Sequence, residues 1–384
     1  IYFQRTHHYL EATPPQPDVE QAKGLFPSFN GDQINRFIFA LPGDLAAGRT
    51  EMNRLESEFP LIRLDTLDWA NDSRVDAAEQ ALRHSFIDAL ETGWRRDVTS
   101  GEPPEGQPTS SYEFSLFITV SGTLPALRAS FDHVSMLALK GRGTPLNLDA
   151  FLQSFPALTG LHIEDYALGE LPQISHLPQL SYLVLERCAL SLSPTSAQAL
   201  QRMVELKHLN LNSNPLTTLP DFSRMPQLIS LSLRNTSLTQ LPDSLIQPAT
   251  VRARVDLSQN LLRELPDQAF LLPPAVSAAL DLSSNPLSPA TLRRVKGYCQ
   301  AKGEHWNADI PASDLQRLKT LYPKLSERDS KRIFFELPGE LEDADTHINR
   351  LSADYAELGT QLQEWALNVP LMDQLQVPLL NENA

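Results

Sequence analysis

The two cysteines are the first residues to consider, because a thiolate nucleophile would make this protein an enzyme. Cys299 lies in Lys296-Gly297-Tyr298-Cys299-Gln300, a segment without the histidine or acid arrangement that activates a catalytic thiol. Cys188 occupies a recurring position that asparagine takes elsewhere in the chain, where a side chain bonds to backbone groups. We therefore expect two structural thiols and no catalytic residue.

Other side chains that could do chemistry are scattered. His7-His8, His176, His208 and His305 show no metal-ligand spacing. There is no phosphate-binding loop, no G-x-G-x-x-G and no G-x-S-x-G. Asp256 and Asp281 each precede a leucine of a predicted strand, where a recurrent polar residue usually lies on a solvated face. The sequence predicts no metal site and no cofactor.

A binding surface is the remaining possibility. Residues two apart on a strand share one face, so polar side chains that alternate with buried leucines should gather on one surface. The predicted partner-binding residues, on a concave face, are His162, Glu164, Tyr182, Glu186, His208, Asn210, Asn212, Arg234 and Asp256. These positions vary between repeats while the leucines stay, as expected of a recognition surface. A merely solvated surface is the alternative for about half of them.

Leucine spacing defines the elements that would position these side chains. Leu206-x-x-Leu209-x-Leu211-x-x-Asn214-x-Leu216 is followed by the same pattern from Leu228. Each unit supplies a short strand and then turns back, and one unit alone cannot bury its leucines, so neighbours must stack. This pattern is that of a leucine-rich repeat.

The repeat has a regular phase. The equivalent position is filled in turn by Tyr166, Cys188, Asn214, Thr236, Asn260 and Asn285. The steps of 22, 26, 22, 24 and 25 residues between them lie within the range of this repeat class. We count about seven units between residues 131 and 292. The predicted fold is an α/β leucine-rich repeat solenoid with a parallel concave sheet and flanking α-helical modules.

A helical module is duplicated around the repeats. Residues 25–70 recur as residues 321–366 at a constant offset of 296, with fourteen of 46 positions identical. In each copy a Leu-Pro-Gly triplet separates a short helix from a long one, because the residue before proline avoids the helical region. The first copy is followed by a further predicted helix over 71–97, which the second copy lacks.

These features predict six segments. They are an extended lead-in over 1–24, a helical module over 25–100, a proline- and glycine-rich loop over 101–111, a solenoid with a strand cap and a closing helix over 112–302, a linker over 303–320, and a second helical module, cut short, over 321–384. A strand is expected over 112–120 at the sheet edge, and a helix over 289–301 after the last repeat.

Composition narrows the class of partner. The 32 basic and 47 acidic residues give a net charge of −15, which argues against a nucleic-acid backbone or an anionic membrane. Two cysteines provide no disulfide framework, no apolar run is long enough to span a membrane, and no cleavable signal is visible. The missing initial methionine suggests an excised piece of a longer protein. Protein is the partner class that remains.

The Leu219-Pro220 and Leu241-Pro242 ends of two repeats, with the Leu-Pro-Gly modules around the array, resemble bacterial effectors of the novel E3 ligase type, especially large pseudomonad-style relatives. The resemblance implies a repeat region that binds a ubiquitination substrate, and a separate helical domain with a catalytic Cys-x-Asp motif. Neither cysteine here matches that motif. The expected function is therefore protein recognition within a secreted bacterial effector or toxin that acts on a host protein. A structural spacer, favoured by the duplicated module, is the alternative, and a catalytic ligase is the weaker third.

Overall fold

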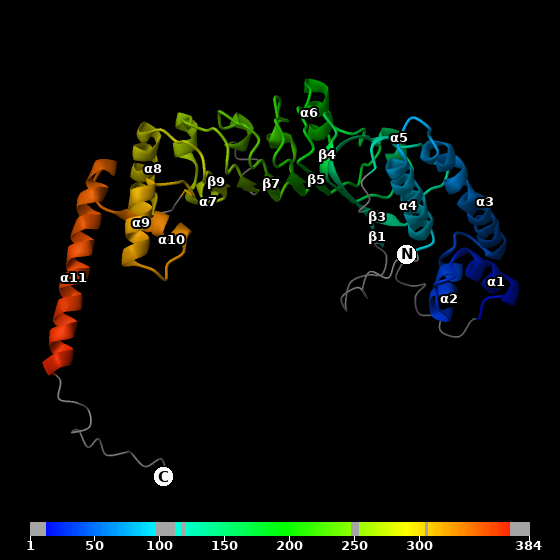
Figure 1. The fold of residues 1–384 in the computed structure, drawn as a ribbon, viewed down its shortest axis with the longest axis horizontal. Helices are drawn as coiled ribbons and strands as arrows, with labels where there is room; N and C mark the ends of the chain where they lie inside the picture. The colour runs from blue at the N-terminus through cyan, green and yellow to red at the C-terminus, as the bar shows by residue number, and fades with distance from the viewer. Residues whose placement is uncertain (1–12, 97–111, 117–119, 247–252, 304–305, 369–384) are drawn as a thin grey trace, which may run out of the picture. The chain divides into compact units, whose positions relative to one another are not determined.

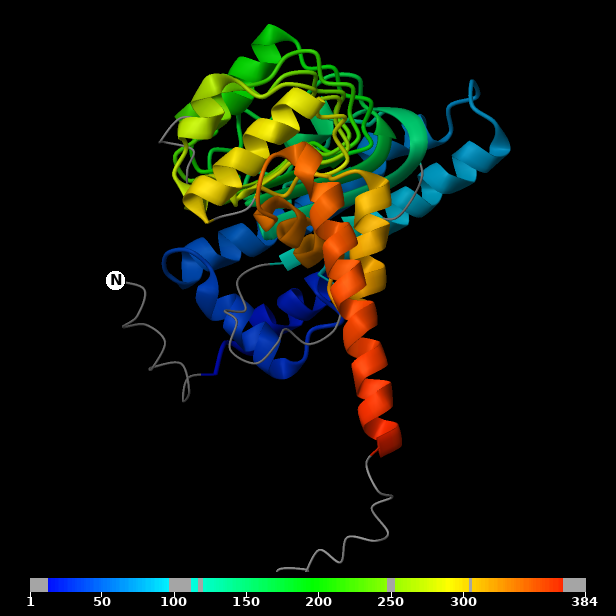
Figure 2. The same ribbon diagram turned by 90° about the vertical axis from the view of Figure 1, so that its left-hand side faces the viewer.

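The computed structural model describes residues 13–96, 112–116, 120–246, 253–303 and 306–368. It divides into two compact units, the first made of Ile1–Ser237 with Asp243–Val255 and the second of Leu238–Pro242 with Asp256–Ala384. The loop predicted over 101–111, His7-His8, and the residues after 368 lie outside the described residues. Figures 1 and 2 show the elements of both units.

The first unit begins with four helices. They are α1 (Gln16–Leu25), α2 (Gly31–Ala40), α3 (Leu45–Ala70) and α4 (Ala77–Trp94). The side chains of Asn30, Asp44 and Asp76 accept backbone N–H groups at the starts of α2, α3 and α4, which satisfies donors that the helix leaves free. The prediction of an extended lead-in over 1–24 is wrong from residue 16, where α1 starts. Prolines fit the first turn of a helix, so Pro15 and Pro17 begin α1 and do not prevent it.

A parallel sheet follows in the same unit. Its strands are β1 (Tyr112–Leu116), β2 (Gly122–Thr123), β3 (Val134–Asn147), β4 (Gly160–Ala167), β5 (Tyr182–Glu186), β6 (His208–Asn210), β7 (Ser230–Ser232) and β8 (Arg254–Asp256). The order is β1-β3-β4-β5-β6-β7-β8, with β2 paired to β3 off this path. The strand predicted at the edge of the sheet is confirmed, because β1 pairs in parallel with β3.

Short helical segments return the chain between these strands. They are α5 (Asp149–Leu152), α6 (Pro194–Gln201), η2 (Phe222–Arg224) and η3 (Asp243–Leu245). Leu137, Leu161, Leu183, Leu209 and Leu231 stand beside one another in the register and are all at most 2% exposed. Burying a leucine side chain stabilises a fold by roughly 1.5–3 kcal/mol, so this row holds neighbouring repeats together.

A second row of buried side chains follows each strand. The Asn214 side chain makes five hydrogen bonds: Oδ1 accepts from the backbone N–H groups of Cys188 and Leu190, and Nδ2 donates to the carbonyls of Leu185, Leu211 and Asn212. Asn260 and Asn285 repeat the pattern. We call the six phased positions, from Tyr166 to Asn285, the ladder. It satisfies backbone groups that the turns would otherwise bury unpaired.

Each ladder residue is preceded by a residue with positive φ. These are Asp165, Arg187, Ser213, Asn235, Gln259 and Ser284, with φ between 52° and 58°. The left-handed conformation costs energy for residues other than glycine, and its recurrence at one phase shows that the turn geometry imposes it.

The second unit contains the last repeats and a second group of helices. Its elements are η5 (Asp267–Leu271), α7 (Pro274–Ser277), β9 (Leu280–Asp281), α8 (Pro289–Lys302), α9 (Ala312–Leu321), α10 (Glu327–Glu336), η6 (Leu341–Asp343) and α11 (Ala344–Asn368). The helix expected after the last repeat is confirmed as α8, capped by Ser288 and ended by Gly303 at φ 69°. The linker expected over 303–320 is wrong in part, because α9 begins at Ala312 after Pro311.

The two helical groups match element by element. At the offset of 296, α1 corresponds to α9, α2 to α10, and α3 to η6 with α11. The short helix ends before the Leu-Pro-Gly triplet in both copies, and Gly43 and Gly339 share φ 77°. The duplication therefore begins earlier than identity alone indicates, at residues 16 and 312.

Candidate functional site

Strand register arranges the predicted site residues in rows on one face of the sheet in the first unit. One row holds Met136, Gly160, Tyr182, His208 and Ser230; the next holds Ala138, His162, Val184, Asn210 and Ser232; the third holds Lys140, Glu164 and Glu186. We call this surface the sheet face. Every row alternates with the buried leucines, so its side chains project away from the core.

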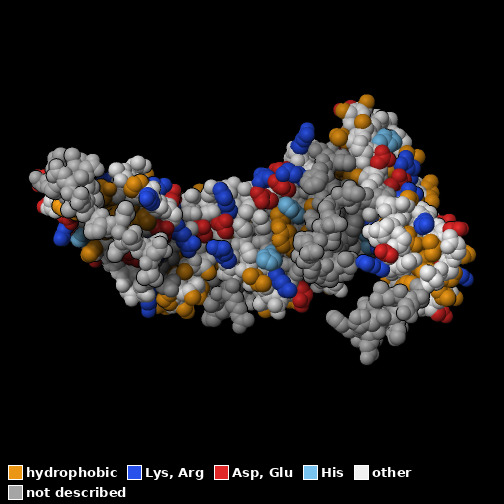
Figure 3. Space-filling model, turned by 90° about the horizontal axis from the view of Figure 1, so that it is seen from below, with side chains coloured by type: hydrophobic (Ala, Val, Ile, Leu, Met, Phe, Trp, Pro, Cys, Tyr) orange, Lys and Arg blue, Asp and Glu red, His pale blue; other side chains and the backbone are white. Residues whose placement is uncertain are grey.

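The centre of the sheet face is apolar and aromatic. The rings of Tyr182 and His208 lie 5.9 Å apart between centroids. Tyr182 is half-buried and His208 is exposed. Val184, in the neighbouring row, is buried. Because Gly160 has no side chain, Met136 can occupy the space beside Tyr182. A Cβ atom at position 160 would lie only 2.2 Å from Met136. Figure 3 views this side, where hydrophobic side chains lie between histidines. Tyrosine and histidine in such a setting suit contact with a protein surface.

A cluster of charges borders this apolar centre. The Arg187 guanidinium contacts the carboxylates of Glu164, Glu186 and Asp165, with Nε 2.5 Å from Asp165 Oδ1. Lys140 Nζ lies 3.2 Å from Glu164 Oε1. The hydrogen bond from Arg187 holds the pKa of Asp165 below its usual value. Two cations therefore face three carboxylates in this cluster, so the charges of Glu164 and Glu186 are only partly offset within the protein.

Asn212 and Arg234 extend the sheet face beyond the strand ends. The Asn212 Oδ1 atom accepts from the Ser232 hydroxyl at 2.7 Å and from the Arg234 backbone N–H at 2.9 Å. Asn210 Oδ1 in turn accepts from the Asn212 backbone N–H. These bonds fix the backbone of neighbouring repeats and leave the side chain of Arg234 exposed.

Asp256 lies at the end of β8, the strand next to β7 in the sheet. It is the residue at which the chain passes from the first unit to the second. Its Oδ1 atom accepts from the backbone N–H of Ser258 at 2.9 Å. Eight of the nine predicted residues lie in the first unit, and Asp256 makes the same local turn contact that Asn210 makes two repeats earlier.

Sequence reasoning missed the residue at the centre of the charged cluster. Arg187 follows strand β5 at the positive-φ position, where alternation along a strand no longer tells which way a side chain points. The phase of the repeat could have identified it, because Arg187 lies 22 residues after Asp165 at the same position of the next unit. Met136, Lys140 and Val184 also belong to the sheet face and were not among the predicted site residues.

Both cysteines are buried and unpaired with each other. The Cys188 Sγ atom lies 3.4 Å from the carbonyl oxygen of Ile163 and 3.3 Å from that of Glu186, the backbone contacts expected at a ladder position. Burial raises the pKa of Cys188 to about 12 and also raises the pKa of Cys299. A thiol with a raised pKa is a poor nucleophile at neutral pH.

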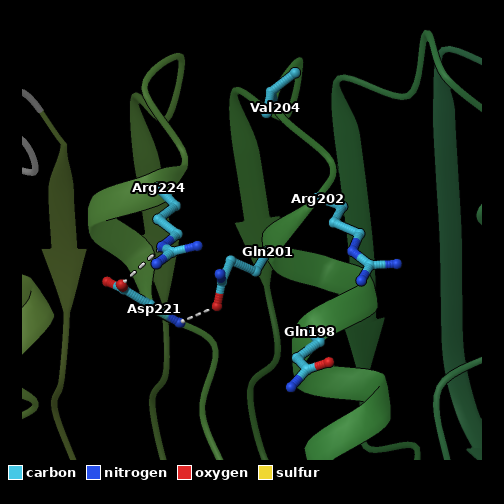
Figure 4. Close-up of a pocket in the computed structure, with 6 residues that line it drawn as sticks. All are labelled: Gln198, Gln201, Arg202, Val204, Asp221 and Arg224. Atoms are coloured by element: carbon cyan, nitrogen blue, oxygen red, sulfur yellow. Dashed lines mark hydrogen bonds and ion pairs between the residues drawn. The ribbon is translucent and has the colours of Figure 1, made fainter.

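A shallow depression lies on the side of the first unit that carries α6 and η2. It has a volume of about 590 Å³ and is lined by Gln198, Gln201, Arg202, Val204, Asp221 and Arg224. Figure 4 shows that Gln201 accepts from the Asp221 backbone N–H and that Asp221 pairs with Arg224. The lining has no nucleophile and no base arranged beside one, so it shows no catalytic constellation.

The described residues also bear on metal binding and on membrane insertion. Within them, no group of three or more histidine, cysteine, aspartate or glutamate side chains is arranged to hold a metal ion. Among the helices that the structure describes, none combines the length and hydropathy needed to cross a membrane.

Comparisons with known proteins agree with the repeat architecture. A model of the leucine-rich repeat family matches residues 205–225. No curated protein matches the chain. Among solved structures, the functional domain of InlJ from Listeria monocytogenes is 22% identical with a TM-score of 0.31, covering 40% of this chain and 31% of that one. A Listeria monocytogenes internalin-like protein is 20% identical with a TM-score of 0.35, covering 44% and 50%.

InlP from Listeria monocytogenes gives similar values, at 22% identity and a TM-score of 0.30 over 48% of this chain and 46% of that one. The aligned part thus spans half or less of each of these structures. The chain is an α/β leucine-rich repeat protein with flanking helical modules. Solenoids of this class present an extended sheet surface that other proteins bind.

Proposed function

We propose that this chain is the recognition region of a secreted bacterial effector or toxin, and that the sheet face binds a partner protein of the host. One observation carries the proposal: side chains of varied chemistry, with Tyr182 and His208 at the centre, stand on a surface whose supporting leucines do not vary. A merely solvated surface does not require an aromatic pair at its centre. Aromatic residues surrounded by polar ones are the usual energetic centre of a protein interface.

The proposed partner is a protein, with neither nucleic acid nor membrane as the target. The net charge of −15 opposes binding to polyanions. Arg187 and Lys140 offset part of the negative charge of the carboxylates nearest the apolar centre. Shape and apolar contact should therefore dominate affinity, with weak dependence on salt.

The resemblance to effectors of the novel E3 ligase type adds a specific form of this proposal. The partner would then be a ubiquitination substrate, and the ligase chemistry would belong to another domain. In the chain itself we propose no catalysis, since both thiols are buried with raised pKa values. Incubation with a ubiquitin-charged conjugating enzyme tests this point: we expect no thioester on either cysteine, and a thioester would make the chain an enzyme.

A scaffold role is the second candidate, and the matched helical modules at residues 16–70 and 312–366 favour it. In that case the sheet face would have no partner, and the repeats would serve as a rigid connection between modules.

Affinity capture from host-cell lysate separates the two candidates. The baits are the intact chain, a sheet-face variant with Tyr182→Ala, His208→Ala and Arg234→Ala, and a control variant with Arg202→Ala, Val204→Ala and Arg224→Ala in the depression of Figure 4. The recognition proposal predicts a protein retained by the intact chain and the control and lost by the sheet-face variant. Identical profiles for all three baits would favour the scaffold.

A further inference from the structure

The last helix of the second unit exposes an apolar stripe. Along α11, residues Tyr355, Leu358, Leu362 and Trp365 follow helical spacing and are 60%, 52%, 55% and 66% exposed. The same stripe is buried at its N-terminal end, where Ala344 and Ile348 are at most 1% exposed and α11 packs on α9. The apolar stripe is therefore buried at its N-terminal end, where α11 packs on α9, and exposed over its C-terminal half. Figures 1 and 2 show no described helix of this unit along that half of α11.

The first copy of the module shows what covers this stripe. The positions equivalent to Leu358 and Leu362 are Ile62 and Thr66 of α3, and both are 0% exposed. Helix α4 packs along α3 in the first unit, and the backbone N–H groups of Arg128 and Ser130 also donate to carboxylates of α3.

Contacts between α3 and α4 define the geometry of this cover. The Trp94 ring lies 5.3 Å from that of Phe59, and the Phe86 ring lies 5.7 Å from that of Trp69. Early residues of α4 thus meet late residues of α3, so the two helices run antiparallel. The Arg83 guanidinium lies 4.5 Å from the centre of the Trp69 ring and donates to the Trp69 carbonyl oxygen at 2.7 Å.

The second copy keeps the residues that α4 would recognise. Phe59 and Trp69 correspond to Tyr355 and Trp365, so an aromatic residue stands at both ends of the stripe. Arg63, which pairs with Asp88 and Glu91 of α4, is replaced by Gly359. A helix that covers α11 therefore needs the aromatic, aliphatic and arginine contacts of α4, and it does not need its acidic residues.

We propose that the stripe on α11 binds one amphipathic helix of a partner protein, packed antiparallel as α4 packs on α3. The helix carries two aromatic residues eight positions apart with aliphatic residues between them, and a basic residue one turn before the first. Residues 369–384 contain no aromatic and no basic residue, so they do not supply this chemistry. The α4 helix of a second copy is held by its own α3. This surface is separate from the sheet face and does not depend on the function proposed for it.

A labelled peptide with the sequence of residues 76–96 is the probe, and the full chain is the target in a fluorescence-anisotropy titration. We expect saturable binding with a Kd of roughly 1–100 μM, since a peptide that folds on binding loses part of its affinity to ordering. A peptide with Phe86→Ala and Trp94→Ala should bind at least about tenfold more weakly.

Variants of the chain locate the binding. Leu358→Asp with Leu362→Asp should weaken binding at least about tenfold, because charges would have to be buried under the helix. Thr360→Asp, on the opposite side of α11, is the matched control and should bind as the wild type does. All replaced side chains are exposed, and thermal unfolding followed by circular dichroism checks that both variants fold.

Three results would overturn the proposal. They are no binding at peptide concentrations near 1 mM, binding that the paired aspartate substitutions leave unchanged, and sedimentation of the chain as a dimer that these substitutions dissociate. The second result would place the peptide elsewhere, for instance on α3 in exchange for α4. The third would assign the stripe to a second copy of the chain.

Discussion

Asn212 and Asn214 are the same residue type, two positions apart in one repeat, and they lie in different surroundings. Asn214 is 1% exposed and bonds five backbone groups of two repeats. Asn212 is half-buried on the sheet face and accepts two hydrogen bonds from the following repeat. The ladder therefore determines the fold, while the sheet face can change its chemistry without loss of the solenoid.

Replacing Asn214 by Ala should produce the largest effect on stability. Four buried backbone groups would lose a hydrogen-bond partner, and one unsatisfied buried group costs about 1–3 kcal/mol. We expect the free energy of unfolding to fall by at least about 3 kcal/mol, measured by urea denaturation. Asn212→Ala is the control and should cost about 1 kcal/mol, since water can replace its partners. Equal losses for the two variants would contradict the comparison.

Cys188, the cysteine at a ladder position, should make an intermediate contribution to the free energy of unfolding. Cys188→Ala removes the two sulfur contacts to backbone carbonyls and leaves a small void, so we expect a loss of about 1–2 kcal/mol. The same urea denaturation measures it. If the alanine variant is as stable as the wild type, the sulfur has no ladder role.

The charged cluster beside the sheet face should contribute less and depend on pH. The folded-state pKa of Asp165 lies below its ordinary value, so its pairing stabilises the protein above that ordinary value and is lost as pH falls through the lowered one. Arg187→Gln should reduce the free energy of unfolding by at most about 1 kcal/mol near pH 7, because the pair is partly exposed.

Urea denaturation near pH 7 and near pH 2 tests this pH dependence. The difference between Arg187→Gln and the wild type should shrink as the pH falls, because protonation of the carboxylate removes its pairing with Arg187. A difference that grows on acidification would reverse the sign of the argument.

Substitutions on the sheet face should have the smallest effect on stability. Exposed side chains such as His208 and Arg234 carry few packing contacts, so His208→Ala and Arg234→Ala should each change the free energy of unfolding by less than about 0.5 kcal/mol. Thermal unfolding measures this. A loss comparable to that of Asn214→Ala would show that the sheet face also holds the fold together.

The sequence predicted those features that repeat. Leucine spacing and the phase of Asn214 follow from packing that every unit shares, and the Leu-Pro-Gly break follows from local backbone preference at Gly43 and Gly339. Helix α1 was not predicted, although the prolines beside Gln16 suit the first turn of a helix.

The site was less predictable than the fold. Alternation assigned Tyr182 and His208 to one face, but it could not show that Arg187 gathers three carboxylates, since that contact joins residues of two repeats across a turn. Contacts of this kind depend on tertiary geometry that a repeat pattern does not encode.

The most direct test of the central claim is the affinity of the purified captured partner for three forms of the chain, measured by isothermal titration calorimetry. We expect the sheet-face variant with Tyr182→Ala, His208→Ala and Arg234→Ala to bind at least about a hundredfold more weakly than the wild type. The variant with Arg202→Ala, Val204→Ala and Arg224→Ala should bind with unchanged affinity. Unchanged binding by the sheet-face variant, or loss confined to the other one, would contradict recognition through the sheet face.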